Sequence, residues 1–394
     1  MPHYRYLIIG AGMAGDAAVR GIREVDASGT IGVLGAEPHP PYNRPPLSKG
    51  LWKGQPEEQI WRDTAALGAE LHLGRRAVRI DKAGHLVVDD RGATYTYEKL
   101  LLATGGQPRR LPLDPAGEHV IYFRTYDDYR RLRERATPGT RFAVVGGGFI
   151  GSEIAAALAL QGVQVIMLFP EEGIGARLFP PGLSRFLNDY YRERGVEVRA
   201  GELAAGLEAR GGRLALRTDR GQEVEVDGVV AGIGIQPNDQ LAAAATLRTD
   251  DGIVVDDYLR TSDPDIYAAG DVARFFAPAL GSRIRVEHED NANTMGQAAG
   301  RNMAGRAEPY HHLPFFYSDL FDLGYEAVGD VDARLQVVED WREPYREGVV
   351  YYLREGRVRG VLLWNVWEQV EHARALIATA GPHHPESLRG RLPV

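Results

Sequence analysis

The 394-residue sequence contains no cysteine. This absence excludes a disulfide framework, a thiolate metal site and a cysteine nucleophile. It also excludes enzymes that reduce disulfides through a redox-active cysteine pair, and those that cycle one cysteine through a sulfenic acid. Cysteine usage therefore gives no information about the redox compartment.

Long apolar runs are also absent. No window approaches the ~18 consecutive apolar residues that span a bilayer. The apolar residues 7–9 lead directly into glycines, without the charged n-region and cleavage site of a secretory signal. We therefore expect a cytoplasmic protein that does not enter a membrane.

Basic residues are fewer than acidic ones: the sequence has 46 Lys and Arg and 54 Asp and Glu, which gives a net charge of −8. A general nucleic-acid binder is therefore not expected. One possible basic patch consists of four arginines, Arg130, Arg131, Arg133 and Arg135. Their spacing is more typical of a solvated helix face. Lysine occurs only at positions 49, 53, 82 and 99, and a lysine kept among so many arginines can indicate a need for a compact ammonium group.

What is present suits a globular protein, with 44% hydrophobic and 25% charged residues. The length predicts roughly two or three domains. Strand 4–9, helix 12–23 and strand 30–34 form one predicted βαβ unit. Strand 141–145, glycine turn 146–151, helix 152–160 and strand 163–169 form a second. The sequence therefore predicts an α/β protein with two Rossmann-like dinucleotide-binding domains.

The first βαβ unit carries the glycine pattern of a dinucleotide-binding loop. Gly10 permits the tight turn, Gly12 lets the backbone approach a pyrophosphate, and Gly15 lets the helix pack closely on the strand. Glu37 lies 22 residues past Gly15, where an acid can accept hydrogen bonds from an adenosine ribose. A plain tight turn is the alternative for a lone glycine pattern, and this context favours a nucleotide site.

The second unit repeats the pattern at Gly146, Gly148 and Gly151, and Glu171 follows Gly151 by 20 residues. A carboxylate there favours the free 2′-hydroxyl of NADH and repels the 2′-phosphate of NADPH. Nearby Arg177 would soften that preference, and a solvated loop acid is the alternative for Glu171. We expect FAD at the first loop and NAD(H) at the second, with NADP(H) as an alternative.

Other segments complete the predicted fold. Residues 86–88 and 94–97 suggest a small antiparallel pair, and residues 100–103 and 266–269 suggest two further buried strands. The segment 226–235 is apolar and broken by glycines. In the aromatic-rich tail from residue 313, strands 348–353 and 357–363 flank a Glu355-Gly356 turn, and a helix is expected over residues 367–380.

The whole chain resembles the FAD-dependent pyridine nucleotide oxidoreductases, in particular the branch of ferredoxin and rubredoxin reductases and apoptosis-inducing factor. The motifs that carry the resemblance include Pro41-Tyr-Asn-Arg-Pro-Pro-Leu-Ser-Lys49, Leu102-Ala-Thr-Gly105, Phe123-Arg124-Thr125, Leu168-Phe-Pro-Glu171, Gly232-Ile-Gly-Ile-Gln-Pro-Asn238, Tyr267-Ala-Ala-Gly-Asp271, Arg285-Val-Glu-His-Glu-Asp-Asn-Ala292, Phe316-Tyr-Ser-Asp319 and Leu362-Leu-Trp-Asn365.

The resemblance implies a division into domains. Residues 1–108 and 237–312 would form an FAD domain split in sequence, residues 109–236 an inserted NAD(P) domain, and residues 313–394 a C-terminal α+β domain of sheet and helix. It also implies residues in contact with the cofactors. Besides those named above, these are Ala14, Arg44, Lys49, Val78, Ala103, Thr104, Gly105, Arg124, Ile150, Glu153, Gly234, Asp271, Glu287, His288, Glu289 and Tyr317.

For the chemistry the sequence and the resemblance favour a pair, Lys49 and Glu153. An ammonium near flavin N5 stabilises the negative charge of reduced flavin, and a carboxylate keeps the ammonium oriented. The alternatives are a lysine at a helix start and an acid favoured by a helix dipole. Two positions depart from the pattern, because Tyr317 stands where this branch often carries Trp, and Glu289 where it carries an aromatic residue or histidine.

The expected function is hydride transfer from NADH to flavin N5, followed by electron transfer to a ferredoxin or rubredoxin. The alternatives are a redox sensor similar to apoptosis-inducing factor and a slow NADH oxidase or diaphorase. Expected partners are a nicotinamide dinucleotide and a small redox protein, with a homodimer as one option. No metal is expected, because His311-His312 and His383-His384 lack further ligands at zinc spacing.

Overall fold

The computed structural model describes residues 1–113 and 119–393, and these residues divide into two compact units. Unit 1 consists of Met1–Arg44, Pro56–Gln107 and Gln236–Pro314. Unit 2 consists of Pro45–Gln55, Pro108–Ile235 and Phe315–Val394. The chain therefore passes between the units at residues 44/45, 55/56, 107/108, 235/236 and 314/315.

Unit 1 is built on a parallel sheet. Its strands lie in the order β3-β2-β1-β6, and β18 also pairs with β6. The bounds are β1 (His3–Ile9), β2 (Ile31–Gly35), β3 (Ala69–Leu73), β6 (Thr94–Leu102) and β18 (Ile266–Ala268). Leu7 and Ile8 are fully buried, as expected for a central parallel strand covered on both faces.

Strand β6 corrects one prediction, because residues 94–102 form a single strand rather than two separate ones. Its first half pairs antiparallel with β5 (Leu86–Asp89), which pairs in turn with β4 (Ala77–Asp81). Its second half pairs in parallel with β18. Glu98 and Lys99 stand at the change of partner and are not buried, so two polar residues interrupt the apolar pattern where the backbone continues.

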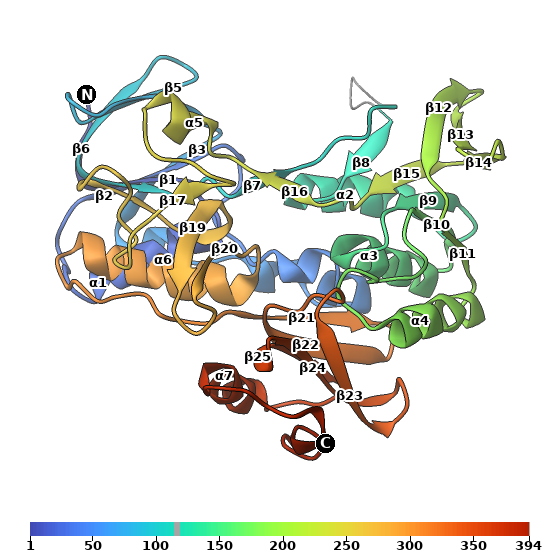
Figure 1. Cartoon of the computed structure of the whole chain (residues 1–394). Helices are drawn as coiled ribbons and strands as arrows, with labels where there is room; N and C mark the ends of the chain where they lie inside the picture. The colour runs from blue at the N-terminus through green and yellow to red at the C-terminus, as the bar shows by residue number, and fades with distance from the viewer. Residues whose placement is uncertain (114–118, 394) are drawn as a thin grey trace. The chain divides into compact units, whose positions relative to one another are not determined.

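Two helices of unit 1, α1 (Met13–Arg23) and α6 (Glu289–Met303), pack against each other, and Figure 1 shows them side by side in blue and orange. Small residues make this packing close. A Cβ atom at Gly300 would lie 2.1 Å from the carbonyl oxygen of Ala18, and one at Gly296 would lie 2.4 Å from that of Ala14. The start of α1, which carries the first glycine loop, is thereby fixed.

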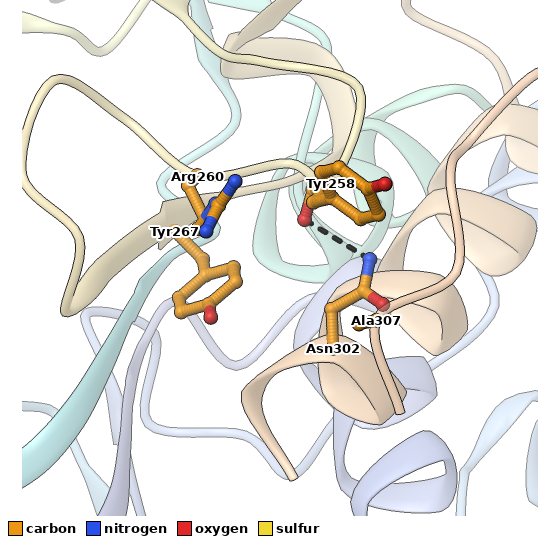
Figure 2. A pocket seen from close by; sticks show the side chains of 5 residues that line it. All are labelled: Tyr258, Arg260, Tyr267, Asn302 and Ala307. Carbon is orange, nitrogen blue, oxygen red and sulfur yellow. Dashed lines mark hydrogen bonds between the residues drawn. The ribbon is translucent and has the colours of Figure 1, made fainter. Parts of the chain in front are cut away.

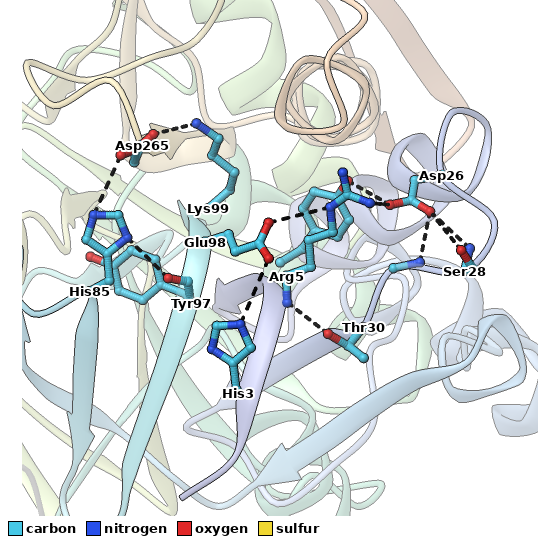
Figure 3. Close-up of polar contacts among 12 residues, drawn as sticks. His3, Arg5, Asp26, Ser28, Thr30, His85, Tyr97, Glu98, Lys99 and Asp265 are labelled. Carbon is cyan, nitrogen blue, oxygen red and sulfur yellow. Dashed lines mark hydrogen bonds and ion pairs between the residues drawn. The ribbon is translucent and has the colours of Figure 1, made fainter.

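The remaining elements of unit 1 are smaller. They are α5 (Gln240–Ala244), β17 (Ile253–Val254), β19 (Ala273–Ala277) and β20 (Ser282–Arg285). The outer ends of β1 and β6 carry a polar network, in which Arg5 contacts both Asp26 and Glu98 (Figure 3). A shallow hollow near α6, lined in part by Tyr258, Tyr267 and Asn302, holds about 90 Å³ (Figure 2).

Unit 2 contains a second parallel sheet with the strand order β11-β10-β9-β15-β8. The bounds are β8 (Val120–Tyr122), β9 (Arg141–Val145), β10 (Gln164–Phe169), β11 (Val196–Ala200) and β15 (Gly228–Ala231). Its helices are α2 (Tyr126–Arg135), α3 (Phe149–Leu160) and α4 (Pro181–Glu193). Both predicted βαβ units are therefore confirmed, with ends that differ by a few residues.

A three-stranded antiparallel sheet packs against this parallel sheet through a shared apolar core that includes Leu216 and Val226. Its strands are β12 (Ala204–Arg210), β13 (Arg213–Thr218) and β14 (Glu223–Val226). The glycine-broken segment 226–235 resolves into the end of β14, all of β15 and the start of β16 (Ile235–Pro237), which pairs with β7 (Gly106–Pro108).

The C-terminal part of unit 2 is a five-stranded antiparallel sheet in the order β21-β22-β25-β24-β23. The bounds are β21 (Phe315–Leu320), β22 (Leu323–Gly329), β23 (Gln336–Glu343), β24 (Glu347–Arg354) and β25 (Arg357–Trp364). The predicted hairpin is confirmed, since Glu355 and Gly356 both have positive φ, at 53° and 71°, as a tight two-residue turn requires.

The last helix, α7 (Val370–Ala378), is shorter than the predicted 367–380. Glu368 has a φ of 63°, and a left-handed residue cannot form part of a right-handed helix, so α7 begins after it. Among the described residues, no helix is long and apolar enough to cross a membrane.

Candidate functional site

The first glycine loop of unit 1 has the geometry that its sequence predicts. Gly10 has a φ of 120°, and a Cβ atom there would lie 2.0 Å from the carbonyl oxygen of Ala103. A Cβ atom at Gly15 would lie 2.0 Å from the carbonyl oxygen of Gly10. Both glycines are therefore required by the fold itself.

Gly12 is different, because no heavy atom of the described residues beyond its local neighbours lies within 4 Å of a Cβ built there. It is the N-cap of α1, and no described side chain caps that helix end. The first backbone N–H groups of α1 thus face an open cradle, which is the arrangement that receives a phosphate. The loop follows β1, which lies between β2 and β6, at the point where such sheets bind ligands.

The second loop, in unit 2, repeats this geometry. Gly146 has a φ of 119°, and its Cβ would lie 2.4 Å from the carbonyl oxygen of Gly232. A Cβ at Gly151 would lie 1.9 Å from the carbonyl oxygen of Gly146, whereas no described atom beyond the local neighbours lies within 4 Å of one at Gly148. Gly148 is the uncapped N-cap of α3, which places Ile150 in the first turn. Both cradles therefore fit a dinucleotide.

The two ribose candidates occupy matching positions, because Glu37 and Glu171 each stand two residues past their strands β2 and β10. Glu37 accepts hydrogen bonds from Tyr42 at 2.6 Å and from Arg44 at 2.6 Å. Burial opposes the charge on Arg44, but Tyr42 and Glu37 outweigh it and raise the pKa of Arg44 above its ordinary value. Glu171 pairs with Arg177 at 2.8 Å.

Other predicted residues of unit 1 gather near the first loop. Thr104 and Asn238 exchange hydrogen bonds of 2.8 and 2.9 Å with each other's backbone carbonyls, and the carbonyl of Gly105 accepts the N–H of Asn238. A Cβ at Gly270 would lie 2.9 Å from that of Ala14. This contact brings Asp271, in a short 3₁₀ helix, beside the first turn of α1.

The residues at the start of α6 lie in the same unit. His288 is the N-cap, Glu289 is the first helical residue, and Glu287 pairs with Arg285 at 2.6 Å. Arg285 also donates to the carbonyl of Asp271 at 3.1 Å, which ties the α6 start to the Asp271 turn. Arg285 was not among the predicted site residues, although it belongs to one of the matching motifs. Val78 lies on β4 and is 51% exposed.

The predicted chemical pair comes together in unit 2. Lys49 Nζ lies 2.7 Å from Glu153 Oε1, and the exposed fractions of their side chains are 13% and 3%. Lys49 precedes a 3₁₀ helix over Gly50–Lys53, and Glu153 lies in the second turn of α3. The Lys49 ammonium also lies 5.3 Å from the centre of the Tyr317 ring. Two residues that are 104 apart in sequence therefore form a nearly dry ion pair beside an aromatic ring.

Comparison with known proteins agrees with this geometry. The family model described as pyridine nucleotide-disulphide oxidoreductase matches residues 4–298. The chain belongs to the pyridine nucleotide-disulphide oxidoreductase family. A second model, of the C-terminal region of apoptosis-inducing factor, matches residues 299–343 and 339–379. Disulphide chemistry is not available to this family member, because its sequence has no cysteine.

Relatives of this oxidoreductase fall into two groups. The ferredoxin–NAD(+) reductase component of an anthranilate 1,2-dioxygenase system from Burkholderia cepacia is 36% identical, over 97% of this chain and 96% of its own. Apoptosis-inducing factor 1 of Dictyostelium discoideum is 34% identical, over 95% of this chain and 78% of its own. The putidaredoxin reductase in a covalent complex with putidaredoxin has a TM-score of 0.92 at 30% identity, covering 98% of this chain and 96% of that chain.

The structure of the oxidoreductase adds two residues that sequence analysis missed. Ser48 donates a hydrogen bond of 2.6 Å to Glu153 Oε2, and Ser318 donates one of 2.6 Å to Glu153 Oε1. Two buried phenols also surround this carboxylate. Burial first, and then the charge of Glu153, raise the pKa of Tyr191 and of Tyr325 well above the ordinary value. The one sequence signal for Ser318 was its place in the matching motif Phe316-Tyr-Ser-Asp319.

Two more predicted residues of unit 2 lie in loops of the nucleotide sheet. Arg124 precedes α2 and donates its backbone N–H to Asp128, and Gly234 has a φ of 89° after β15. On α2, Arg133 donates to Gln161 at 2.8 Å and Arg135 to the carbonyl of Asp227 at 2.7 Å, which favours a structural helix face over a basic patch. No group of three or more metal-ligating side chains forms within the described residues.

Proposed function

We propose that the chain is an NADH-dependent FAD oxidoreductase that passes electrons to a small redox protein of the ferredoxin or rubredoxin type. The observation that carries this proposal is the pair of matching cradles at Gly12 and Gly148, each open at the N-terminus of its own helix. One chain that binds two dinucleotides needs them for different tasks, and the combination of flavin and nicotinamide fits the family.

We assign FAD to a domain of residues 1–108 and 237–312, the nicotinamide dinucleotide to residues 109–236, and a separate C-terminal domain to residues 313–394. Within unit 1, FAD would be held by Gly10, Gly12, Ala14, Gly15, Glu37, Arg44, Val78, Ala103, Thr104, Gly105, Asp271, Glu287, His288 and Glu289. FAD contacts of Arg124 and Tyr317 stay predictions from the family resemblance. NADH would be held at the second loop by Gly148, Ile150, Gly151, Glu171, Arg177 and Gly234.

Lys49 and Glu153 are the residues that we place at the reaction. FAD, when bound, accepts a hydride from the nicotinamide and releases electrons one at a time. Lys49 supplies a fixed ammonium, whose positive charge stabilises the negative charge that develops during reduction. Glu153 holds that ammonium at 2.7 Å. The pair is mostly withheld from water, so its field is screened less than that of a surface pair.

The choice of NADH over NADPH depends on Glu171. Its carboxylate stands past β10, where a ribose 2′-hydroxyl would be recognised and a 2′-phosphate repelled. Its partner Arg177 is 85% exposed, so the ion pair between them is weak and can open for a ribose. We therefore expect NADH as the main donor.

The electron acceptor is proposed from relatives that are named as ferredoxin or putidaredoxin reductases. The test is anaerobic mixing of the FAD-loaded protein with NADH, followed by steady-state reduction of a ferredoxin. Bleaching of the flavin and reduction of the iron–sulfur protein are expected. A purified protein that is colourless and takes up no FAD would overturn the proposal, whereas failure with every small redox protein of the organism would overturn only the acceptor.

A second candidate is a redox sensor similar to apoptosis-inducing factor, because the C-terminal region matches the family model of that protein. Reoxidation after NADH reduction separates the two. Rapid reoxidation by a redox protein favours the reductase, and a slow return with an NADH-dependent change in oligomeric state favours the sensor. A cytoplasmic location and a homodimer stay predictions.

A further inference from the structure

The Glu153 carboxylate has more hydrogen-bond donors than an ion pair needs. Its Oε1 accepts from Lys49 at 2.7 Å and from Ser318 at 2.6 Å, and its Oε2 accepts from Ser48 at 2.6 Å. The donors come from two places, the segment 45–55 and the C-terminal sheet, and α3 carries the acceptor. The side chain of Glu153 is only 3% exposed, so water contributes little to holding it.

Ser318 places a buried hydroxyl on an otherwise apolar face of its strand, where it contacts both Glu153 and the phenol of Tyr325. It lies in β21 opposite Tyr325 of β22, and its exposed fraction is 0%. The alternate residues Phe316 and Leu320 share its face of the strand, and the Phe316 ring packs edge-on against Phe149 at the start of α3, with 5.1 Å between ring centres. Among these apolar neighbours, the Ser318 hydroxyl donates its hydrogen to Glu153.

We propose that Ser318 is a positioning residue of the C-terminal sheet that fixes Glu153, and through it aims the ammonium of Lys49. An ammonium has three N–H donors, and Glu153 Oε1 takes one of them. When Ser318 holds the same oxygen, the carboxylate cannot turn about its last bond, and the direction of the other two N–H bonds is set. Ser48 holds the second oxygen in the same way. This inference rests on the proposed function of Lys49.

The charges around the pair favour this role over a purely structural one. The described groups that face Glu153 are Lys49, two serines and the phenols of Tyr191 and Tyr325, both of which stay neutral because burial raises their pKa. Lys49 is thus the single cation against the single anion among these groups. The serines add donors without adding charge, so they orient the pair and leave its net charge at zero.

The central experiment is stopped-flow reduction of the FAD-loaded protein by NADH between about pH 5.5 and 9. Ser318→Ala is expected to lower the limiting rate constant on the order of tenfold, the usual effect of losing one hydrogen bond to a charged group, with the NADH dissociation constant unchanged. The dependence of the rate on pH is also expected to differ from that of the wild type, because the Glu153 carboxylate has lost a donor. Ser318→Thr, which keeps the hydroxyl, is expected to restore the profile.

The matched control is Ser184→Ala, which removes another buried serine hydroxyl of unit 2. Ser184 is 2% exposed and donates to the carbonyl of Ile174 at 2.8 Å, on α4 rather than at the ion pair. Its rate and pH profile are expected to match those of the wild type. A second readout needs no turnover: the flavin midpoint potential is expected to fall in Lys49→Met and, by less, in Ser318→Ala.

A double variant separates positioning from structure. Because Ser318 acts through Lys49, Ser318→Ala is expected to cause no further loss in a Lys49→Met background. A wild-type rate and profile in Ser318→Ala, or an additive loss in the double variant, would overturn the inference while leaving the proposed function intact. If Lys49→Met itself reduces flavin at the wild-type rate, the proposed role of the pair fails and the inference fails with it.

Discussion

Replacing Glu153 by glutamine tests the buried pair most directly, because glutamine keeps the volume and removes the charge. At 2.7 Å, Coulomb attraction amounts to about 6 kcal/mol in an effective dielectric constant of about 20. Desolvation of both ions offsets much of this, and removing one partner of a buried pair typically costs about 3–5 kcal/mol. No cavity forms, so the loss reflects electrostatics and hydrogen bonding alone.

The amide of Glu153→Gln also disturbs the hydrogen bonds at this position. Glu153 accepts from Lys49, Ser48 and Ser318, whereas a glutamine has one acceptor oxygen and a donor NH₂ group. If the amide oxygen takes the place of Oε1, the NH₂ group takes the place of Oε2, and the Ser48 hydroxyl must turn from donor to acceptor. We expect unit 2 of the FAD-free variant to lose about 3 kcal/mol of unfolding free energy, and its thermal midpoint to fall by roughly 6–12 °C. Flavin reduction by NADH is expected to slow by about 100-fold.

Circular dichroism of the FAD-free protein measures the midpoint, and stopped-flow absorbance of the loaded protein measures the rate. Glu171→Gln is the matched control for the thermal midpoint, since its partner Arg177 is 85% exposed and such a pair contributes about 0–1 kcal/mol. The double variant Lys49→Met/Glu153→Gln is expected to regain part of the stability, because no unpaired ion remains. A fall of less than about 2 °C in Glu153→Gln, or a double variant as unstable as the sum of the single ones, would refute the reasoning.

Three further predictions follow from other parts of the molecule. Glu171→Ala is expected to weaken NADH binding more than NADPH binding in fluorescence titrations, and equal losses would remove the basis for preferring NADH. Gly12→Val is expected to abolish FAD uptake while leaving the melting temperature of the apoprotein near that of the wild type, because the cradle is open and the φ of −93° suits any residue. In contrast, Gly15→Val is expected to destabilise the apoprotein by about 1–3 kcal/mol or more, since its Cβ would lie 2.0 Å from a carbonyl oxygen. Hydrogen bonds from the backbone N–H groups of Gly29 and Ser28, and from the Tyr6 hydroxyl, lower the pKa of Asp26 from 3.8 to about 2 (Figure 3). The stabilisation that ionised Asp26 contributes is therefore present above about pH 4 and is lost as the pH falls toward 2. The difference in urea midpoint between the wild type and Asp26→Asn should shrink over that range.

Much of the fold could be predicted from local patterns. Strand β9 was placed to the residue, and α1 and β10 to within one residue, because a buried parallel strand followed by a glycine turn leaves few other solutions. The error at β6 has a physical cause. The strand continues in one direction while its pairing changes from β5 to β18, and two polar residues lie at that change. In the sequence, these two polar residues look the same as a loop between two separate strands.

The site was predictable to a different degree. The glycines and the acids past β2 and β10 are fixed by spacing within one βαβ unit, so sequence was sufficient for them. The Lys49–Glu153 pair spans 104 positions. The rarity of lysine drew attention to Lys49, but the family resemblance was needed to pair it with Glu153. Ser318 lies a further 165 residues from Glu153. Its hydroxyl reaches Glu153 only because β21 packs against α3, and the sequence alone does not predict that tertiary contact.

The interleaving of the two units along the chain has a practical consequence. Neither unit is a continuous stretch, and the short segment Pro45–Gln55, with its flanks in unit 1, supplies Lys49 to unit 2. A protease that cuts once at any crossing cannot release a complete unit, and a recombinant fragment covering residues 108–393 would lack the lysine that Glu153 is built to hold. Such a fragment would bury an unpaired carboxylate, so dissection of this protein calls for circular permutation or for co-expression of complementary pieces.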